Sequence, residues 1–270
     1  MKKIFALALS VLSAQGAAGC AYISESMERP ALFYPRREYV ATPAMAGLKA
    51  EEVFILSGEF KIHCWFFQGR PDALNIVYFH GNAENISYLL GLVQMFEPSG
   101  INFLLVDYRG YGHSQGAPSV DGIVEDAVAA VDWMMARRNA PSGRVALWGR
   151  SMGAAAALGA TQQRPGLAGI IVESGFISLK KIAAHHMPRL PSFLVRDKLN
   201  NLAIISSLPI PKLIIHGERD KVIPFDHGVE LYEKAMAPKE FFPVAEAGHN
   251  DVTKKADDYH RRISAWLSTL

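Results

Sequence analysis

The sequence lacks the features that mark several classes of protein. Two cysteines in 270 residues cannot form a disulfide scaffold. The 28 Lys and Arg residues nearly balance the 26 Asp and Glu residues, and no basic block occurs, which excludes the electrostatic footprint of a nucleic-acid-binding protein. No P-loop or dinucleotide-binding signature occurs. We expect no metal or organic cofactor, because His185 and His186 come without further ligands in a metal-binding spacing.

Long apolar runs are also missing, and the one at the N-terminus is short. Lys2 and Lys3 precede the apolar run Ile4–Leu12, and small residues follow as far as Gly19. A run of this length is too short to cross a bilayer comfortably. Two basic residues, a short apolar run and small residues are the pattern of a secretory signal peptide. We therefore predict a signal peptide over residues 1–19, which is removed from the mature protein.

The end of this segment, Ala17-Ala18-Gly19-Cys20, resembles the lipobox of bacterial lipoproteins, although the first position is usually Leu. The resemblance implies that Cys20 is acylated and holds the protein on a membrane. Ala21 in place of Asp implies the outer membrane, facing the periplasm. Ordinary cleavage near Ala14 is the alternative. The other cysteine, Cys64, fits a small buried apolar residue better than a reactive thiol.

The rest of the chain reads as one domain that alternates strands and helices. Residues 20–50 carry closely spaced prolines and are expected to form an extended arm. Glu52–Ser57 and Lys61–Phe67 predict an antiparallel hairpin. Six further strands are expected at Asn75–Phe79, Asn102–Val106, Arg144–Trp148, Ala168–Val172, Lys212–His216 and Glu240–Val244. Helices are expected between them at Ile86–Phe96, Val120–Arg138, Met152–Gln163, Phe225–Met236 and Thr253–Leu267.

This order predicts an α/β fold over residues 51–270, with a mostly parallel eight-stranded sheet, an N-terminal antiparallel hairpin and flanking helices. Continuous apolar runs such as Phe103–Val106 are typical of strands buried on both faces. One connection, residues 174–209, is much longer than the others. We expect it to form a short helical cap above the carboxyl ends of the strands, where open α/β sheets place their sites.

A G-x-S-x-G motif occurs twice, around Ser114 and around Ser151. The chemistry of a nucleophile elbow needs a serine on a sharp turn between a strand and a helix, with glycines where a Cβ atom would collide. Ser151 meets this requirement, because a predicted strand precedes it and a run of strong helix formers follows. Ser114 does not, since Ala117-Pro118 follows it. We therefore predict Ser151 as the nucleophile and a loop with turn-forming glycines over Asp107–Gly116.

A serine nucleophile needs a base, and the base needs an acid that orients it. In elbow enzymes of this fold the order along the chain is Ser, acid, His. Asp220 and His249 follow the last two predicted strands and are the candidates, with Glu218 as the competing acid. The backbone amides of Asn82 and Met152 are the candidates for the oxyanion hole.

Five segments in this order resemble the α/β-hydrolase superfamily, and within it the bud-emergence-type hydrolases and related protein depalmitoylases. They are FHGNAEN, DYRGYGHSQG, WGRSMGAAAA, HGERDKVIP and EAGHND. The resemblance covers nearly the whole mature chain. It implies the α/β-hydrolase fold and a serine hydrolase with Ser151, Asp220 and His249 as its catalytic triad.

The expected function is hydrolysis of a carboxylic ester or thioester through an acyl-enzyme. Two alternatives stay open. One is an amide or peptide hydrolase of the prolyl-aminopeptidase type, whose motifs overlap with these. The other is a membrane-tethered binding protein that keeps the fold without turnover, although all three triad positions are filled.

Overall fold

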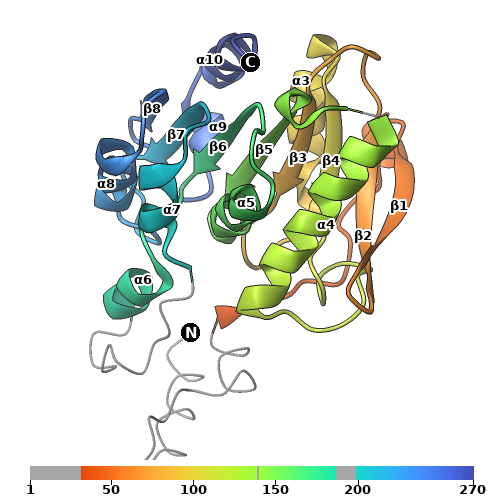
Figure 1. Ribbon diagram of the computed structural model, residues 1–270, viewed down its shortest axis with the longest axis horizontal. Coiled ribbons are helices and arrows are strands. Elements are labelled where there is room, and N and C mark those ends of the chain that lie inside the picture. The colour runs from red at the N-terminus through yellow and green to blue at the C-terminus, as the bar shows by residue number, and fades with distance from the viewer. Residues whose placement is uncertain (1–31, 139, 187–198) are drawn as a thin grey trace, which may run out of the picture.

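The computed structural model describes residues 32–138, 140–186 and 199–270 (Figure 1). The predicted signal peptide, residues 1–19, and the predicted acylation site Cys20 lie outside the described residues, as does the arm before residue 32. Among the residues that the structure describes, no helix is both long enough and apolar enough to cross a membrane.

An eight-stranded sheet runs through the molecule in the order β1-β2-β4-β3-β5-β6-β7-β8. The pairs β1–β2 and β2–β4 are antiparallel and the others are parallel, which confirms the predicted fold class. The strands are β1 (Glu51–Ser57), β2 (Phe60–Phe67), β3 (Asn75–Phe79), β4 (Asn102–Val106), β5 (Val145–Arg150), β6 (Gly169–Glu173), β7 (Lys212–Gly217) and β8 (Lys239–Val244).

Helices cover both faces of the sheet. The α-helices are α3 (Leu90–Phe96), α4 (Val120–Arg138), α5 (Met152–Gln163), α6 (Leu179–His186), α7 (Asn201–Ser207), α8 (Phe225–Lys234), α9 (Val252–Lys255) and α10 (Tyr259–Leu267). Short 3₁₀ turns are η1 (Ala44–Ala46), η2 (Ile86–Leu89), η3 (Glu97–Ser99) and η4 (Ser142–Arg144). In Figure 1, α4 and α5 lie in front of the sheet and α3 lies behind it.

The strands divide the core in two because successive side chains of a strand point to opposite faces. In β3, Val77 and Phe79 join the cluster under α4, α5 and α8, whereas Ile76 and Tyr78 join the cluster under α3 and α10. All four are buried. The central strands β3 and β4 are therefore buried along their whole length and are apolar after their first residues, Asn75 and Asn102, as expected for strands covered on both sides.

One predicted helix is wrong in its extent. The sequence predicted a single helix over Thr253–Leu267, but the structure divides it into α9 and α10. Ala256 adopts an extended conformation, and Asp258 occupies the position before the first residue of α10. Asp is a poor former of helix interiors, and two follow one another here. The break directs the Tyr259 hydroxyl into the core, where it donates to Glu173 at 2.7 Å.

The long connection between β6 and β7 contains α6 and α7, which a bridge between Ser178 and Asn200 brings together. Helix α7 packs against α5 and α8, and its Ile205 is fully buried. Residues 187–198 lie outside the described part of the chain, so the cap over residues 174–209 stays a prediction.

A buried ion pair fixes the loop after β4 to helix α4. The Arg109 guanidinium donates to Asp126 at 2.8 and 3.0 Å, and the Arg109 backbone amide donates to the same carboxylate at 2.8 Å. Asp126 is fully buried and Arg109 is 7% exposed. The guanidinium also pairs with the exposed Glu125 at 2.8 Å. Removing Asp126 as a partner leaves a largely buried charge without its closest acceptors.

We expect Asp126→Asn to lower the free energy of unfolding by about 3 kcal/mol, because Arg109 loses its main acceptor. The matched control is Asp132→Asn on the same helix, which breaks the half-exposed pair with Arg164 and should cost less than about 1 kcal/mol. Urea unfolding followed by circular dichroism measures both. Equal losses in the two variants would contradict this account of Asp126.

Candidate active site

Ser151 lies on a sharp turn between β5 and α5, as the sequence predicted. Its backbone has φ 55° and ψ −117°, a conformation that L-residues rarely adopt. The flanking glycines permit this turn because, without Cβ atoms, they allow neighbouring backbone segments to pack closely against them. A Cβ atom on Gly149 would lie 2.3 Å from the Gly153 carbonyl oxygen, and one on Gly153 would lie 2.0 Å from the Phe79 carbonyl oxygen. Both glycines of the motif are therefore required by the packing of the elbow.

The structure brings Ser151, Asp220 and His249 together from three separate segments. The Nε2 atom of His249 lies 3.1 Å from the Ser151 Oγ atom, and its Nδ1 atom lies 2.7 Å from Asp220 Oδ2. The other carboxylate oxygen of Asp220 accepts the backbone N–H groups of Val222 and Ile223, both at 2.8 Å. This leaves Oδ2 directed at the imidazole, which is the arrangement that orients a general base.

The surroundings of Asp220 keep it ionised. Burial alone would raise the pKa of this carboxyl group, but the hydrogen bond and charge of His249 and the two backbone amides outweigh it, so the pKa is lowered. The competing acid Glu218 is exposed, and in the described structure no hydrogen bond or ion pair joins it to His249, whose Nδ1 atom pairs with Asp220. His216 lies beneath the pair, with its Nε2 atom 2.9 Å from the Ile223 carbonyl oxygen. Burial lowers the pKa of His216, so it is neutral at physiological pH.

The loop after β3 places Asn82 beside the elbow. A Cβ atom on Gly81 would lie 3.5 Å from the Ser151 Cβ atom, so the two segments are in direct contact. Met152 is the first residue of α5, where backbone N–H groups have no acceptor within the helix. Among the described residues, no hydrogen bond uses the backbone N–H group of Asn82 or of Met152. Both predicted amides are thus free to donate to a substrate.

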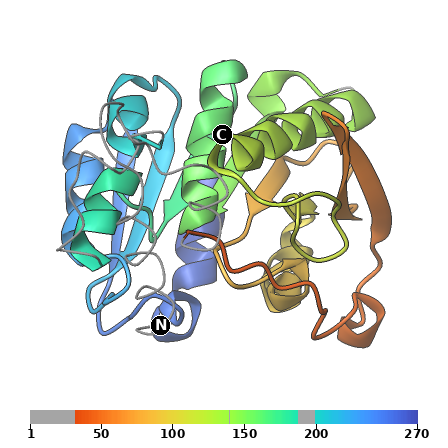
Figure 2. The ribbon, with the colours of Figure 1, turned by 90° about the horizontal axis from the view of Figure 1, so that it is seen from below.

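The N-terminal arm holds this loop in place. The Asn82 side chain donates to the Leu32 carbonyl oxygen at 2.6 Å and accepts the Tyr34 backbone N–H group at 2.9 Å. Asn85 donates to the carbonyl oxygens of Arg36 and Glu38 at 3.2 and 2.8 Å. Figure 2 shows the described part of the arm, in red, crossing this side of the molecule. The conformation of the loop therefore depends on a segment far away in the sequence.

Arg150 connects the three segments of the site. Its guanidinium donates to both oxygens of Glu84 at 3.1 and 3.2 Å, and Glu84 accepts the Gly81 backbone N–H group at 2.7 Å. The same guanidinium donates to the Asn250 side chain at 2.6 Å and to the His249 carbonyl oxygen at 3.4 Å. Burial alone would lower the pKa of Arg150, but Glu84 raises it above its ordinary value, so the cation is permanent.

A cavity of about 680 Å³ opens beside Ser151 and His249. Helix α3 and the turn before it contribute apolar side chains, among them Leu89, Leu92 and Met95. Glu84 and Glu173 are the acidic residues that line it. Glu84 is paired with Arg150, and Glu173 accepts hydrogen bonds from Trp148 and Tyr259 at 3.1 and 2.7 Å. Both carboxylates are therefore already occupied by donors of the chain itself.

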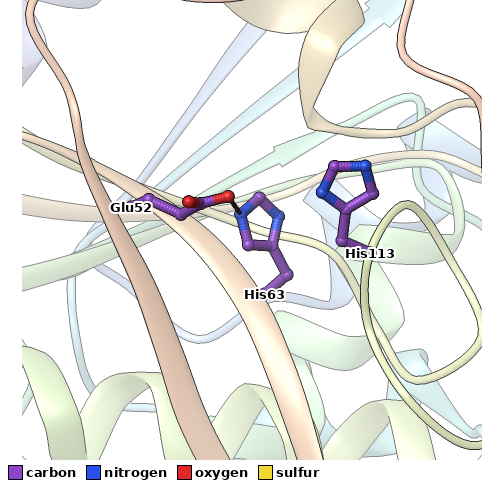
Figure 3. A group of neighbouring side chains, drawn as sticks. All are labelled: Glu52, His63 and His113. Carbon is purple, nitrogen blue, oxygen red and sulfur yellow. Dashed lines mark hydrogen bonds and ion pairs between the residues drawn. The ribbon is translucent and has the colours of Figure 1, made fainter.

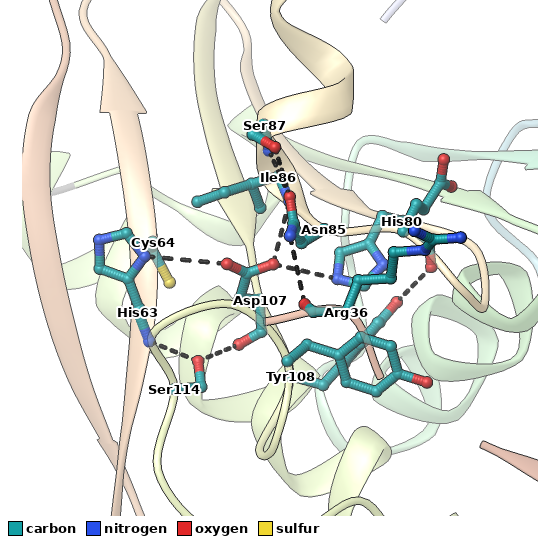
Figure 4. Close-up of polar contacts among 12 residues, drawn as sticks. Arg36, His63, Cys64, His80, Asn85, Ile86, Ser87, Asp107, Tyr108 and Ser114 are labelled. Atoms are coloured by element: carbon teal, nitrogen blue, oxygen red, sulfur yellow. Dashed lines mark hydrogen bonds and ion pairs between the residues drawn. The ribbon is translucent and has the colours of Figure 1, made fainter. Parts of the chain in front are cut away.

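Ser114, the serine of the second motif, has a structural place. It is fully buried, donates to the Asp107 carbonyl oxygen at 2.7 Å and accepts the His63 backbone N–H group at 2.8 Å (Figure 4). The glycines of this loop, Gly110, Gly112 and Gly116, all have positive φ, which confirms that they serve turns. No strand-to-helix elbow surrounds Ser114.

Asp107, at the start of this loop, joins it to the loop after β3. Its Oδ1 atom accepts the Ile86 backbone N–H group at 3.0 Å and lies 3.3 Å from His80 Nε2. Its Oδ2 atom accepts the Tyr39 hydroxyl at 2.5 Å. Burial alone would raise the pKa of Asp107, but the neighbouring His63, His80 and Tyr39 side chains lower it. The result is a buried carboxylate between the hairpin, the arm and the Asn82 loop.

Sequence reasoning missed Arg150, Glu84, Asn85 and the arm as parts of the site. Arg150 and Glu84 lie within the quoted motifs, and the signal was an opposite-charge pair on two segments that the fold brings together. The contacts of the arm had no signal, because they use mostly its backbone atoms.

Comparison with known proteins places the chain in a family. Residues 70–207 match the family model described as serine aminopeptidase, S33, which is about half of the chain. The protein YfhR of Salmonella typhimurium is 32% identical over 253 residues, covering 86% of this chain and 84% of that protein. The α/β-hydrolase domain-containing protein WAV2 of Arabidopsis thaliana is 31% identical over 220 residues, covering 74% of this chain and 71% of that protein.

Among solved structures, an esterase from Pyrococcus furiosus is similar in fold. It has a TM-score of 0.74 and 22% sequence identity, and the match covers 88% of this chain and 97% of that one. The nucleophile elbow, the order of the strands in the sheet and the similar proteins all indicate the same superfamily. The chain belongs to the α/β-hydrolase superfamily and, within it, to the family described as serine aminopeptidase, S33.

Proposed function

We propose that this protein is a serine hydrolase that cleaves carboxylic ester or thioester bonds. The observation that carries the proposal is the hydrogen-bonded chain Ser151–His249–Asp220, in which Oγ lies 3.1 Å from Nε2 and Nδ1 lies 2.7 Å from the carboxylate. Nucleophile, base and orienting acid within hydrogen-bond reach are what acyl transfer requires.

In this proposal the Ser151 Oγ atom attacks the substrate carbonyl carbon while His249 Nε2 accepts the hydroxyl proton. Asp220 stabilises the imidazolium that forms and keeps its own charge. The tetrahedral oxyanion accepts hydrogen bonds from the Asn82 and Met152 amides. His249 then donates its proton to the departing alcohol or thiol as the acyl-enzyme forms. A water molecule that His249 deprotonates attacks the acyl-enzyme, which releases the acid and restores Ser151.

An aminopeptidase of the prolyl type is the second candidate, and the description of the matching family favours it. Such an enzyme must bind the ammonium group of its substrate with an acidic group. In the described cavity Glu84 and Glu173 already accept hydrogen bonds from Arg150, Trp148 and Tyr259. A charged amine would have to displace these donors, whereas an acyl chain would pack against the apolar residues of α3. Hydrolysis of an ester or thioester is therefore the first candidate activity, and aminopeptidase activity is the second.

The purified protein should hydrolyse p-nitrophenyl acyl esters faster than aminoacyl p-nitroanilides, and Ser151→Ala should lower kcat/KM by at least about 10⁴-fold. A fluorophosphonate probe should label the parent protein and fail to label Ser151→Ala. Ser114→Ala is the matched control, because it removes the serine of the other motif and should leave labelling intact.

Two results would contradict the proposal in different ways. Labelling that survives Ser151→Ala would show that another residue is the nucleophile. Faster cleavage of aminoacyl anilides than of esters would retain the triad and establish the aminopeptidase instead. A series of esters with increasing acyl length, measured in the same assay, identifies the preferred chain.

Asn82→Ala tests whether the Asn82 side chain, held by the arm and by Tyr111, positions the oxyanion hole. The variant keeps the backbone amide but loses the side-chain bonds to Leu32, Tyr34 and Tyr111. We expect kcat for the ester to fall about 10- to 100-fold with KM nearly unchanged, because the amide no longer meets the developing charge at the right place. Asn75→Ala, at the other end of β3, is the control and should change stability without changing kcat. An unchanged kcat in Asn82→Ala would refute this role.

We further propose that the chain is exported and held on a membrane by acylation of Cys20, on the strength of the leader pattern. In a Gram-negative host fed a clickable fatty acid, the parent protein and Cys64→Ser should be labelled, and Cys20→Ser should not. Cys64 is the matched control because it is the only other cysteine. Labelling of Cys20→Ser, or no labelling of the parent, would rule out a lipid at this position.

A further inference from the structure

Three side chains that the proposed reaction does not use converge on one spot at the edge of the sheet. They are Glu52 of β1, His63 of β2 and His113 of the loop after β4 (Figure 3). One potential ligand atom of each lies within 4.8 Å of those of the other two. His63 is fully buried, whereas Glu52 and His113 are exposed. The cluster therefore has one fixed member and two members that solvent can reach.

The hairpin register explains why Glu52 and His63 meet. Phe54 lies opposite His63 in the antiparallel ladder, and Glu52 is two residues away on the same face of β1. Its Oε1 atom lies 2.9 Å from His63 Nε2. His113 reaches the same spot because its ring stacks on Tyr39, with 4.3 Å between centroids, and because the preceding amide, Gly112 N–H, donates to the Arg36 carbonyl oxygen at 2.9 Å.

The hydrogen bonds around Tyr39 fix which nitrogen of His63 carries its proton. The Tyr39 hydroxyl has a single hydrogen, and its oxygen lies 2.5 Å from Asp107 Oδ2 and 2.6 Å from His63 Nδ1. The hydroxyl donates to the carboxylate, so the imidazole Nδ1–H group must donate to the hydroxyl oxygen. In the neutral ring the Nε2 lone pair then faces the Glu52 carboxylate at 2.9 Å. Either a proton on Nε2 or a metal ion in its place satisfies both atoms at this distance.

We propose that Glu52, His63 and His113 form a binding site for a divalent transition-metal ion of the zinc class. Two imidazoles and a carboxylate are a donor set that zinc accepts, and hard ions such as Mg²⁺ prefer oxygen ligands only. His63 is held through its other nitrogen by Tyr39 and Asp107, which is the support that metal-binding histidines receive in known sites. Glu52 and His113 are exposed and can close on the ion, and solvent supplies the fourth ligand.

Such an ion would join β1, β2 and the Asp107–Gly116 loop at one point. The same loop contains Asp107, which accepts the Ile86 backbone N–H group at the end of the Asn82 loop. The metal site is therefore separate from Ser151. It is connected through Asp107 to the Asn82 loop, which contains the proposed oxyanion hole. This inference does not depend on the proposed hydrolase activity.

The test measures metal binding directly, on the full chain with Cys20→Ser so that a free thiol does not compete. Titration with Zn²⁺ against a competing chelator should show one equivalent bound. Glu52→Gln and His113→Asn should each weaken binding at least about tenfold. Tyr39→Phe keeps the stacked ring but removes the acceptor of His63 Nδ1–H, and should weaken binding by a similar factor. Co²⁺ should give visible d–d absorption that His113→Asn abolishes, and Mg²⁺ should not compete.

Thermal unfolding gives a second readout that needs no activity. At a hundredfold excess of Zn²⁺ over its Kd, the Tm should rise by about 5 °C, and at the same Zn²⁺ concentration the rise in His113→Asn should be about half of this or less. The double substitution His185→Asn and His186→Asn, on the exposed face of α6, is the control and should change neither readout. No stoichiometric binding at micromolar Zn²⁺, binding that survives both exposed-ligand substitutions, or binding lost only in the α6 variant would overturn the proposal.

Discussion

One partly buried cation, the guanidinium of Arg150, joins the loops that form the site. The Arg150 guanidinium, which belongs to the elbow, donates to Glu84 of the Asn82 loop and to the His249 carbonyl oxygen and Asn250 of the loop after β8. Each of these segments ends a different strand, and nothing in the sheet ladder itself fixes how three loops meet above it. A planar, permanently charged group with several donors can satisfy three directions together. The position of Ser151 relative to His249 is thus set by an interaction between side chains as much as by the backbone fold.

The fold could be predicted because its main signals are local. Asn75–Phe79 and Asn102–Val106 are buried on both faces, so their apolar runs marked both strands with the observed bounds. Val120–Arg138 and Met152–Gln163 were likewise found with the observed bounds. The division of the last helix could not be found in this way. The break at Ala256 to Asp258 places the Tyr259 hydroxyl against Glu173, a contact that joins residues 86 positions apart. Hydrophobic periodicity contains no information about such a contact.

The residues of the site also divide into those with a local sequence signal and those that depend on contacts between distant segments. Ser151, Asp220 and His249 could be identified because each follows a predicted strand and the order of such residues along the chain is characteristic of elbow enzymes. The arm, the Arg150–Glu84 pair and the Glu52–His63–His113 cluster could not. His185 and His186 are neighbours in the sequence and were therefore considered as metal ligands. The three residues that meet in space are instead spread over residues 52 to 113. Their meeting depends on hairpin register and on a loop conformation, and both are known only once the chain is folded.

The arm has a consequence for how this sequence can change over time. It holds the Asn82 loop mainly through its own backbone, since the groups that Asn82 and Asn85 contact are the carbonyl oxygens of Leu32, Arg36 and Glu38 and the amide of Tyr34. Every amino acid offers these carbonyl groups, and every one except proline offers the amide. These backbone contacts constrain the spacing along the arm more than its side chains, although Phe33, Arg36 and Tyr39 also make side-chain contacts. Insertion or deletion of a single residue within this segment would shift every contact beyond it, so relatives should conserve the length of the arm more strictly than its composition.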